Sequence, residues 1–252
     1  MAKLTKEDQY IKSLELKKEH THTFNEFPLN LPAVKHLKKL SFHPNVTCII
    51  GENGMGKSTL LEGLAVALGF NAEGGSMNFN FSSYDSHSSL NDYLRVARGV
   101  YRPEDSFFFR AETYYNLATN IEEMDRDPLG GGRVIDSFGG KSLHEQSHGE
   151  SFFAAFLHRF RGQGLYILDE PEAALSPLRQ ISMLGRINEL VEQGSQLIIA
   201  THSPILMAHP DTKIIQLTEE GLNELALEET DHFSVMKQFF EDKDRLLQHL
   251  FK

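Results

Sequence analysis

The chain has 252 residues, of which 40% are hydrophobic, so its length fits one large or two small α/β domains with a buried core. Its formal net charge of −10 argues against a surface that coats nucleic acid nonspecifically and leaves only a local basic patch open. A single cysteine, Cys48, excludes an intramolecular disulfide and a cysteine-based zinc cluster. Because the sequence has neither an apolar run long enough to span a membrane nor an apolar leader, we expect a cytoplasmic protein.

The first predicted elements are extended. Apolar and polar residues alternate over residues 11–16, which is typical of an edge strand with one exposed face. Prolines interrupt residues 24–31, so we expect an extended or turning segment there. Phe24, Phe27 and Phe42 are candidates to face adenine if the chain binds a nucleotide, and the alternative is that each belongs to the core.

A glycine-rich stretch lies between a predicted buried strand at residues 46–50 and a predicted helix at residues 58–68, which stops at Gly69. Between them lie Gly51, Glu52, Asn53, Gly54, Met55, Gly56, Lys57, Ser58 and Thr59. The pattern G-x-x-x-x-G-K-[ST] predicts a nucleotide-phosphate loop, in which Lys57 reaches the β- and γ-phosphates and the Ser58 hydroxyl ligates Mg²⁺. The helix N-terminus also favours anions. A chance glycine-rich turn is the alternative, against which the flanking strand and helix argue.

The next segment has a different composition. Residues 89–104 look helical, and an aromatic strand follows before residue 111. The helical segment carries three arginines, Arg95, Arg98 and Arg102. They form either a small anion-binding face or a solvated helix face, and we favour the solvated helix face.

A second turn-and-helix segment follows a Gly-rich connection at residues 125–142. Its turn contains Ser147, Gly149 and Glu150, and residues 152–160 then have a helical apolar face. Because free N–H groups and the helix dipole point outward at such a turn, this is a second candidate anion site.

An apolar strand at residues 165–168 ends in two carboxylates, Asp169 and Glu170. At the carboxyl edge of a parallel sheet, Asp169 holds Mg²⁺ directly or through water beside the phosphate loop. Glu170 is then close enough to orient or deprotonate an attacking water molecule. Two solvated acids that cap a strand are the alternative, against which the apolar character of the strand argues.

Another helix and another buried strand follow. Ser176 as N-cap and Pro177 at the first position begin a helix that ends at Gly194. Residues 196–201 then form a buried strand with His202 at its carboxyl end. A histidine at that edge hydrogen-bonds a terminal phosphate oxygen or has a structural role.

The carboxyl-terminal part predicts a hairpin and a long helix. Residues 213–217 and 222–227 flank a turn, and residues 232–251 form an amphipathic helix. We expect its apolar face to pack back on the sheet, and contact with a partner is the alternative.

Together these segments resemble the nucleotide-binding domain of the ABC-type ATPases, in the branch that includes SMC, RecF and related repair or defence ATPases. The resemblance covers residues 11–217. Residues 51–59 match the family's Walker A loop, residues 165–170 match its Walker B strand with the catalytic glutamate, and His202 matches its switch histidine.

The resemblance extends to the second anion site. Ser147, Gly149 and Glu150 belong to a segment that looks like the family's signature loop, and residues 173–176 occupy the position of its D-loop. The match implies that two subunits close head to tail, with Ser147 and Gly149 of one subunit touching the γ-phosphate held by Lys57 of the other.

Three departures from the family pattern stand out. His148 replaces the first signature glycine, and Ser176 stands where an aspartate is usual. No glutamine is found at the strand end where the family has its Q-loop, so Arg110 or Glu112 takes that place. These departures concern the hydrolysis rate and the coupling of Mg²⁺ to lobe movement rather than nucleotide binding.

We therefore expect a P-loop α/β fold, a single ABC-type ATPase domain over residues 1–252. Its sheet is mostly parallel with helices on both sides, and the amino terminus contributes an antiparallel β edge. A small helical lobe at approximately residues 85–162 is inserted between Walker A and Walker B.

The resemblance implies Mg²⁺-dependent ATP binding and hydrolysis, with Lys57, Glu170 and His202 as catalytic residues and Ser58 and Asp169 as Mg²⁺ ligands. ATP is expected to promote a homodimer that serves as the ATPase switch of a DNA repair or defence system, with DNA or a nuclease or effector protein as partner. The alternatives are the cytoplasmic ATP-binding subunit of a membrane transporter and a slow ATP-binding scaffold.

Overall fold

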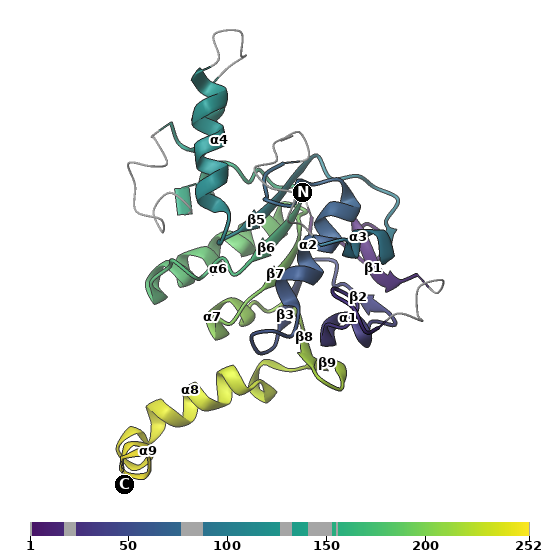
Figure 1. The fold of residues 1–252 in the computed structure, drawn as a ribbon. Coiled ribbons are helices and arrows are strands. Elements are labelled where there is room, and N and C mark those ends of the chain that lie inside the picture. The colour runs from purple at the N-terminus through teal and green to yellow at the C-terminus, as the bar shows by residue number, and fades with distance from the viewer. Residues whose placement is uncertain are drawn as a thin grey trace.

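A six-stranded, mostly parallel sheet lies at the centre of the computed structural model, which describes residues 2–17, 24–76, 88–126, 133–140, 153–154 and 156–251. Across the sheet the strands are β5 (Asp105–Arg110), β6 (Gly164–Asp169), β7 (Gln196–Ala200), β3 (Val46–Ile50), β8 (Thr212–Thr218) and β9 (Gly221–Leu225). The first five run parallel, and β9 pairs antiparallel with β8 (Figure 1). The predicted α/β fold with a mostly parallel sheet is confirmed.

Helices cover both faces of this sheet. They are α2 (Lys57–Leu68) on one face and α4 (Tyr114–Arg126), α6 (Pro177–Glu192) and α7 (Pro204–Met207) on the other. Because successive side chains of a strand point to opposite faces, Cys48 of β3 packs on the α6 side and Ile49 on the α2 side. Both side chains are buried, as in the parallel sheets of α/β proteins. None of the described helices combines the length and apolarity needed to cross a membrane.

Two helix boundaries agree with the predicted caps. α2 ends before Gly69, whose φ of 99° lies in the left-handed region that glycine adopts without strain. α6 begins after Ser176, whose Oγ accepts a hydrogen bond from the backbone N–H of Arg179 at 3.4 Å, and Pro177 takes the first position. Local capping chemistry therefore determines where these two helices begin or end.

A second, antiparallel sheet packs over α2. Its strands are β2 (Leu40–Ser41), β1 (Ile11–Leu16) and β4 (Leu94–Arg98), in this order across the sheet. The antiparallel element contributed by the amino terminus is confirmed. The prediction of an edge strand at residues 11–16 is wrong, because β1 has a hydrogen-bonded neighbour on each side.

Residues 89–104 do not form the predicted helix. Within this range, all of which is described, only α3 (Leu90–Tyr93) is helical, and β4 follows it directly. Leu94 and Val96 pack on the core shared with α2, whereas Arg95 is exposed like the other two arginines of this segment. This period of two suits a strand paired with β1, and the non-local pairing overrides the local helical pattern. The three arginines are each exposed to solvent, but they do not share a helix face as we expected, because Arg95 and Arg98 lie on β4.

The range 85–162 contributes strands to both sheets before it becomes helical. After β4 and β5, the chain forms α4 and the short 3-10 helix η2 (Val134–Phe138). α4 begins beside β5, where the ring of Tyr114 contacts that of Phe109, and its far end projects beyond the sheet (Figure 1). The Asp125 carboxylate accepts hydrogen bonds from the N–H groups of Val134, at 2.6 Å, and Ile135, at 2.9 Å. These contacts join η2 to the end of α4, and residues 141–152 lie outside the described part of the chain.

The carboxyl-terminal helices extend away from both sheets. The predicted hairpin is confirmed as β8 and β9, and η4 (Leu227–Glu229) leads to α8 (Asp231–Glu241) and α9 (Lys243–Leu250). Neither α8 nor α9 has a buried residue, and Figure 1 shows them projecting from the body of the molecule. The prediction that one helix at residues 232–251 packs on the sheet is wrong, since amphipathic periodicity predicts a helix but not the surface that it contacts.

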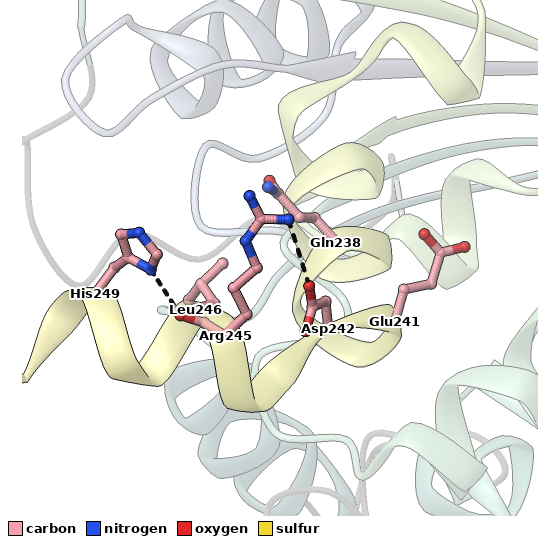
Figure 2. Close-up of a pocket in the computed structure, with 6 residues that line it drawn as sticks. All are labelled: Gln238, Glu241, Asp242, Arg245, Leu246 and His249. Carbon is pink, nitrogen blue, oxygen red and sulfur yellow. Dashed lines mark hydrogen bonds and ion pairs between the residues drawn. The ribbon is translucent and has the colours of Figure 1, made fainter.

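A bend at Asp242, with φ −141° and ψ 53°, separates α8 from α9. Figure 2 shows Arg245 directed toward Asp242, with its Nη1 3.8 Å from Oδ2. His249 Nδ1 lies 2.9 Å from the carbonyl oxygen of Arg245. These contacts are local, so they stabilise the bend and α9 without anchoring either helix to the sheets.

Candidate active site

The loop between β3 and α2 turns sharply because of its glycines. Gly51 and Gly56 have φ values of 147° and 93°. A Cβ atom at Gly51 would lie 2.7 Å from the carbonyl oxygen of Leu217, which excludes any side chain there. The turn ends at Lys57, the first residue of α2, so the free N–H groups of the first helical turn border the loop. This arrangement suits an anion such as a phosphate.

Lys57 lies buried beneath this loop. Its Nζ donates hydrogen bonds to the carbonyl oxygens of Gly51, at 2.7 Å, and Glu52, at 3.1 Å. Burial lowers the pKa of Lys57, whereas the carboxylates of Glu170 and Asp169 act to raise it. Because an ammonium group has three N–H donors, one beyond these two remains available for a phosphate.

Ser58 and Asp169 bring two oxygen atoms together at the edge of the sheet. Ser58 Oγ lies 3.1 Å from Asp169 Oδ1, and Asp169 is the last residue of β6. Burial raises the pKa of Asp169 to about 6, while Arg110 and the Ser58 hydroxyl act to lower it. Hydroxyl and carboxylate oxygens are the ligands that Mg²⁺ prefers, and a cation would also offset the cost of the buried charge. The two residues therefore fit the predicted metal site.

Arg110, the last residue of β5, borders the same site. Its Nη1 lies 2.6 Å from Glu62 Oε2 on α2, and its Nε lies 3.8 Å from Asp169 Oδ2. The side chain of Glu112 is 82% exposed, with Oε2 3.4 Å from Arg110 Nη2. Of the two residues considered for the Q-loop position, Arg110 is therefore the one beside Asp169. Glu62 was missed by the sequence analysis, because a single glutamate inside a helical pattern carries no motif.

Glu170 has a backbone conformation that is uncommon for a residue with a side chain. Its φ is 51°, and its N–H donates a hydrogen bond to the carbonyl oxygen of Ala200 at 2.9 Å. Left-handed residues other than glycine are rare and concentrate at functional sites. The Glu170 side chain is partly exposed, and its Oε1 lies 3.7 Å from His202 Nε2. A partly exposed carboxylate and a histidine therefore face each other across the ends of β6 and β7.

His202 follows the end of β7 and is held on two sides. Its backbone N–H donates to Glu172 Oε1 at 2.6 Å, and its ring Nδ1 lies 3.2 Å from Nε2 of His232 on α8. Its Nε2 faces Glu170 and is buried without a hydrogen-bond partner among the described residues. Burial lowers the pKa of His202, and the charge of Lys57 lowers it further, so the ring is neutral at pH 7. No motif in the sequence indicates His232, because it lies 30 residues further along the chain.

The remaining residues of the predicted site fall into three groups. Glu52, Asn53 and Gly54 are exposed at the tip of the loop. Met55 and Thr59 are partly buried. Ser147, Gly149 and Glu150 of the second predicted anion site lie outside the described residues.

The three phenylalanines considered as adenine contacts differ in exposure. Phe42 is buried in the core on the α2 side, and Phe24 packs against the same core. Phe27 is 63% exposed. Of the three, Phe27 is therefore the residue whose ring is accessible to a ligand.

A groove of about 720 Å³ joins the phosphate loop to the start of α8. The residues that line it include Glu52, Asn53, His202, Asp231, His232, Val235 and Met236. The exposed tip of the loop, the strand-end histidine and the first turns of α8 thus share one surface.

Five side chains converge at the carboxyl ends of the central parallel strands. They are Lys57, Ser58, Asp169, Glu170 and His202. Chemically, this set can hold a phosphate group, a divalent cation and a water molecule next to one another, because it combines an ammonium, two oxygen ligands for a metal, a free carboxylate and a neutral imidazole.

Two family models match parts of this chain. Residues 20–121 match a model described as "AAA domain", and residues 142–208 match one described as "AAA domain, putative AbiEii toxin, Type IV TA system". The energy-coupling factor transporter ATP-binding protein EcfA1 of Fusobacterium nucleatum subsp. nucleatum is 30% identical over 186 residues, which cover 67% of this chain and 68% of that protein. The cobalt import ATP-binding protein CbiO of Salmonella typhimurium is 29% identical over 185 residues, which cover 69% of this chain and 67% of that protein.

Two solved structures align with most of this chain at low sequence identity. One is an SMC head bound to the C-winged helix domain of ScpA, with 16% identity and a TM-score of 0.46, covering 86% of this chain and 97% of that chain. The other is an inward-facing conformation of a putative metal-chelate type ABC transporter, with 15% identity and a TM-score of 0.49, covering 90% of this chain and 88% of that chain.

Proposed function

Because this chain belongs to the ABC-type P-loop ATPases, proteins that bind and hydrolyse ATP, we propose that it is a cytoplasmic, Mg²⁺-dependent switch. In this proposal ATP closes two copies head to tail and hydrolysis reopens them. The observation that carries it is the convergence of the five side chains described above at one edge of the sheet. Residues 1–252 would form a single ATPase domain, with the helical lobe near residues 85–162.

ATP binding rests on the phosphate loop in this proposal. The backbone N–H groups of residues 51–59 face the phosphates, and Lys57 donates an N–H to their oxygens. Ser58 and Asp169 would hold Mg²⁺, which would supply charge neutralisation for the phosphate oxygens. The exposed ring of Phe27 is available to the base.

Hydrolysis rests on the two residues that face each other across the ends of β6 and β7. Glu170 orients a water molecule for in-line attack and accepts its proton, for which its partly exposed carboxylate is suited. His202 donates a hydrogen bond from Nε2 to a γ-phosphate oxygen, for which its buried Nε2 is suited, because it has no hydrogen-bond partner among the described residues. Both roles are matters of position, because phosphoryl transfer needs little covalent chemistry from the protein.

Dimer closure gives a role to the second predicted anion site, which is separate along the chain from the phosphate loop. In the proposed dimer, Ser147, Gly149 and Glu150 of one copy approach the γ-phosphate held by Lys57 of the other. The loop tip of each copy is exposed and free to receive them. ATP favours this state and ADP does not, since only the γ-phosphate contacts both subunits.

We propose DNA repair or defence as the process, with DNA or a nuclease or effector protein as the partner. Support comes from Glu150, which resembles the SMC-like signature, and from the missing transporter glutamine at the strand end where Arg110 lies. The second candidate is the ATP-binding subunit of a membrane transporter, which the names of the two relatives favour.

The proposal is tested by the mass in solution of Glu170→Gln, a variant that binds ATP without hydrolysing it. We expect a monomer without nucleotide and with ADP, and a dimer with Mg²⁺-ATP. Glu219→Gln, the same change in the exposed turn between β8 and β9, is the matched control and remains monomeric once ATP is consumed. A Glu170→Gln variant that stays monomeric at saturating ATP contradicts head-to-tail closure.

Short duplex DNA added to each sample separates the two candidate processes. A DNA-dependent shift of the ATP-bound dimer, or stimulation of ATP turnover by DNA, favours repair or defence. A membrane protein that copurifies with the chain in stoichiometric amount favours the transporter subunit.

A further inference from the structure

The residues that precede α8 lie against the body of the molecule, although the helix itself has no buried residue: Leu227 packs against the core on the α6 side. Thr230 caps this helix: its Oγ1 accepts a hydrogen bond from the N–H of Phe233 at 3.3 Å and donates one to the carbonyl oxygen of Leu227 at 2.7 Å. The Thr230 side chain is 0% exposed. His232, two residues later, is therefore held in place beside His202.

The two histidine rings share one hydrogen atom. His232 Nε2 lies 3.2 Å from His202 Nδ1, and the ring centroids are 5.4 Å apart. Burial is the largest cause that lowers the pKa of both rings. The charge of Lys57 lowers both pKa values further and His202 lowers that of His232, while Glu170 acts to raise the pKa of His202 and Asp231 that of His232. Both rings are therefore neutral at pH 7, and one of the two facing nitrogens donates while the other accepts.

Only two tautomer pairs satisfy this contact. In the first, His232 Nε2–H donates to His202 Nδ1, so His202 carries its hydrogen on Nε2 and His232 Nδ1 is a bare acceptor. In the second, His202 Nδ1–H donates to His232 Nε2, so His202 Nε2 is a bare acceptor and His232 carries a hydrogen on Nδ1.

The surroundings favour the first pair. His202 Nε2 lies 3.7 Å from the Glu170 carboxylate, so a lone pair there would repel the carboxylate and a hydrogen would attract it. His232 Nδ1 is buried without a partner among the described residues, and a buried N–H without an acceptor is the costlier defect. The contact of His202 with Glu170 and the burial of His232 Nδ1 therefore both favour a hydrogen on His202 Nε2.

We propose that His232 is a positioning residue for ATP hydrolysis, which holds His202 in the Nε2–H tautomer so that its ring donates to the terminal phosphate. This inference rests on the proposed role of His202. It gives α8 a part in the reaction, because movement of its first turn removes the donor that sets the tautomer.

The tautomer is measured directly by nitrogen-15 NMR of histidine-labelled protein without nucleotide. The chain has 12 histidines, and His202→Gln identifies the ring signals of His202 by their loss. We expect a protonated Nε2 and an unprotonated Nδ1 for His202 near neutral pH. The opposite pattern overturns the proposal, whatever the turnover of the enzyme.

Two substitutions of His232 test the effect on turnover. His232→Gln keeps an amide N–H donor at the position of Nε2, and we expect its kcat to stay within about 3-fold of the wild type. His232→Leu removes the donor, and we expect kcat to fall on the order of 10-fold with KM nearly unchanged. The same two changes at His249, which is exposed on α9, are the matched controls (Figure 2).

A His232→Leu variant that turns over ATP as fast as His249→Leu overturns the proposal, as does a loss in His232→Gln equal to that in His232→Leu. If Glu170→Gln remains monomeric with ATP, head-to-tail closure fails, while the NMR pattern and the ratio of the His232 variants still decide the positioning role.

Discussion

The carboxyl-terminal edge of the central sheet, where the parallel strands end, differs from the carboxyl-terminal helices in what it buries. The sheet edge buries charged side chains, whereas the helices expose apolar ones. At the sheet edge, charged Lys57 and Asp169 are each 5% exposed. At the end of α8 and directly after α9 the reverse holds, since Phe240 and Phe251 are 72% and 81% exposed. Buried charge and exposed apolar surface both cost free energy, and both are typical of places that contact something else. The comparison indicates that the carboxyl ends of the parallel strands suit a charged ligand, whereas α8 and α9 leave apolar surface exposed.

The largest expected difference between the two regions concerns turnover. Asp169→Asn removes the carboxylate that we propose as a Mg²⁺ ligand, so we expect turnover of Mg²⁺-ATP to fall on the order of 1,000-fold, or about 4 kcal/mol of transition-state stabilisation. Asp244→Asn makes the same change on α9, where the side chain is 89% exposed, and leaves steady-state turnover unchanged. An active Asp169→Asn variant contradicts the proposed metal site.

The second difference concerns the free energy of unfolding. Ile199 of β7 is fully buried, so Ile199→Ala should lower the free energy of unfolding by about 3 kcal/mol, measured by urea denaturation. Phe240→Ala removes a larger side chain from an exposed position and should change it by less than about 0.5 kcal/mol. A comparable loss in both variants would show that α8 is covered in solution.

The third and smallest difference concerns pH. Because burial raises the pKa of Asp169 from 3.8 to about 6, the folded state binds a proton before the unfolded state as pH falls. Above pH 6 the buried Asp169 charge therefore lowers the free energy of unfolding of the wild type. This loss disappears as Asp169 is protonated between about pH 6 and about pH 4. The free energy of unfolding of Asp169→Asn minus that of the wild type should therefore fall by about 2 kcal/mol when the pH is lowered from about 7.5 to about 4.5. A constant difference over this range contradicts the raised pKa, and Asp244→Asn is the control.

Much of the sheet edge could be predicted from the sequence, because two rules place its residues. A glycine-rich loop between a strand and a helix specifies the position of Lys57 and Ser58. The carboxyl ends of parallel strands meet at one edge, which brings Asp169, Glu170 and His202 to the same place. Neither rule requires knowledge of how distant segments pack.

The missed features all depend on packing between distant segments. β4 was predicted as a helix because its pairing with β1 is invisible in local periodicity. The contacts of Arg110 with Glu62 and of His202 with His232 join residues from different elements, and no spacing along the chain announces them. The direction of α8 and α9 was missed for the same reason, since their pattern specifies an apolar face without specifying its neighbour.

The position of Arg110 has a mechanical consequence. Arg110 is the last residue of β5, and the segment that follows it leads directly into α4, whose far end projects beyond the sheet. The same guanidinium pairs with Glu62 of α2 and lies beside Asp169 of β6. A force applied to α4 is therefore transmitted along the backbone to the residue that links the helix behind the phosphate loop with the strand that ends at the metal site. The side chain of Arg110 thus connects the start of this path to α2 and to the end of β6.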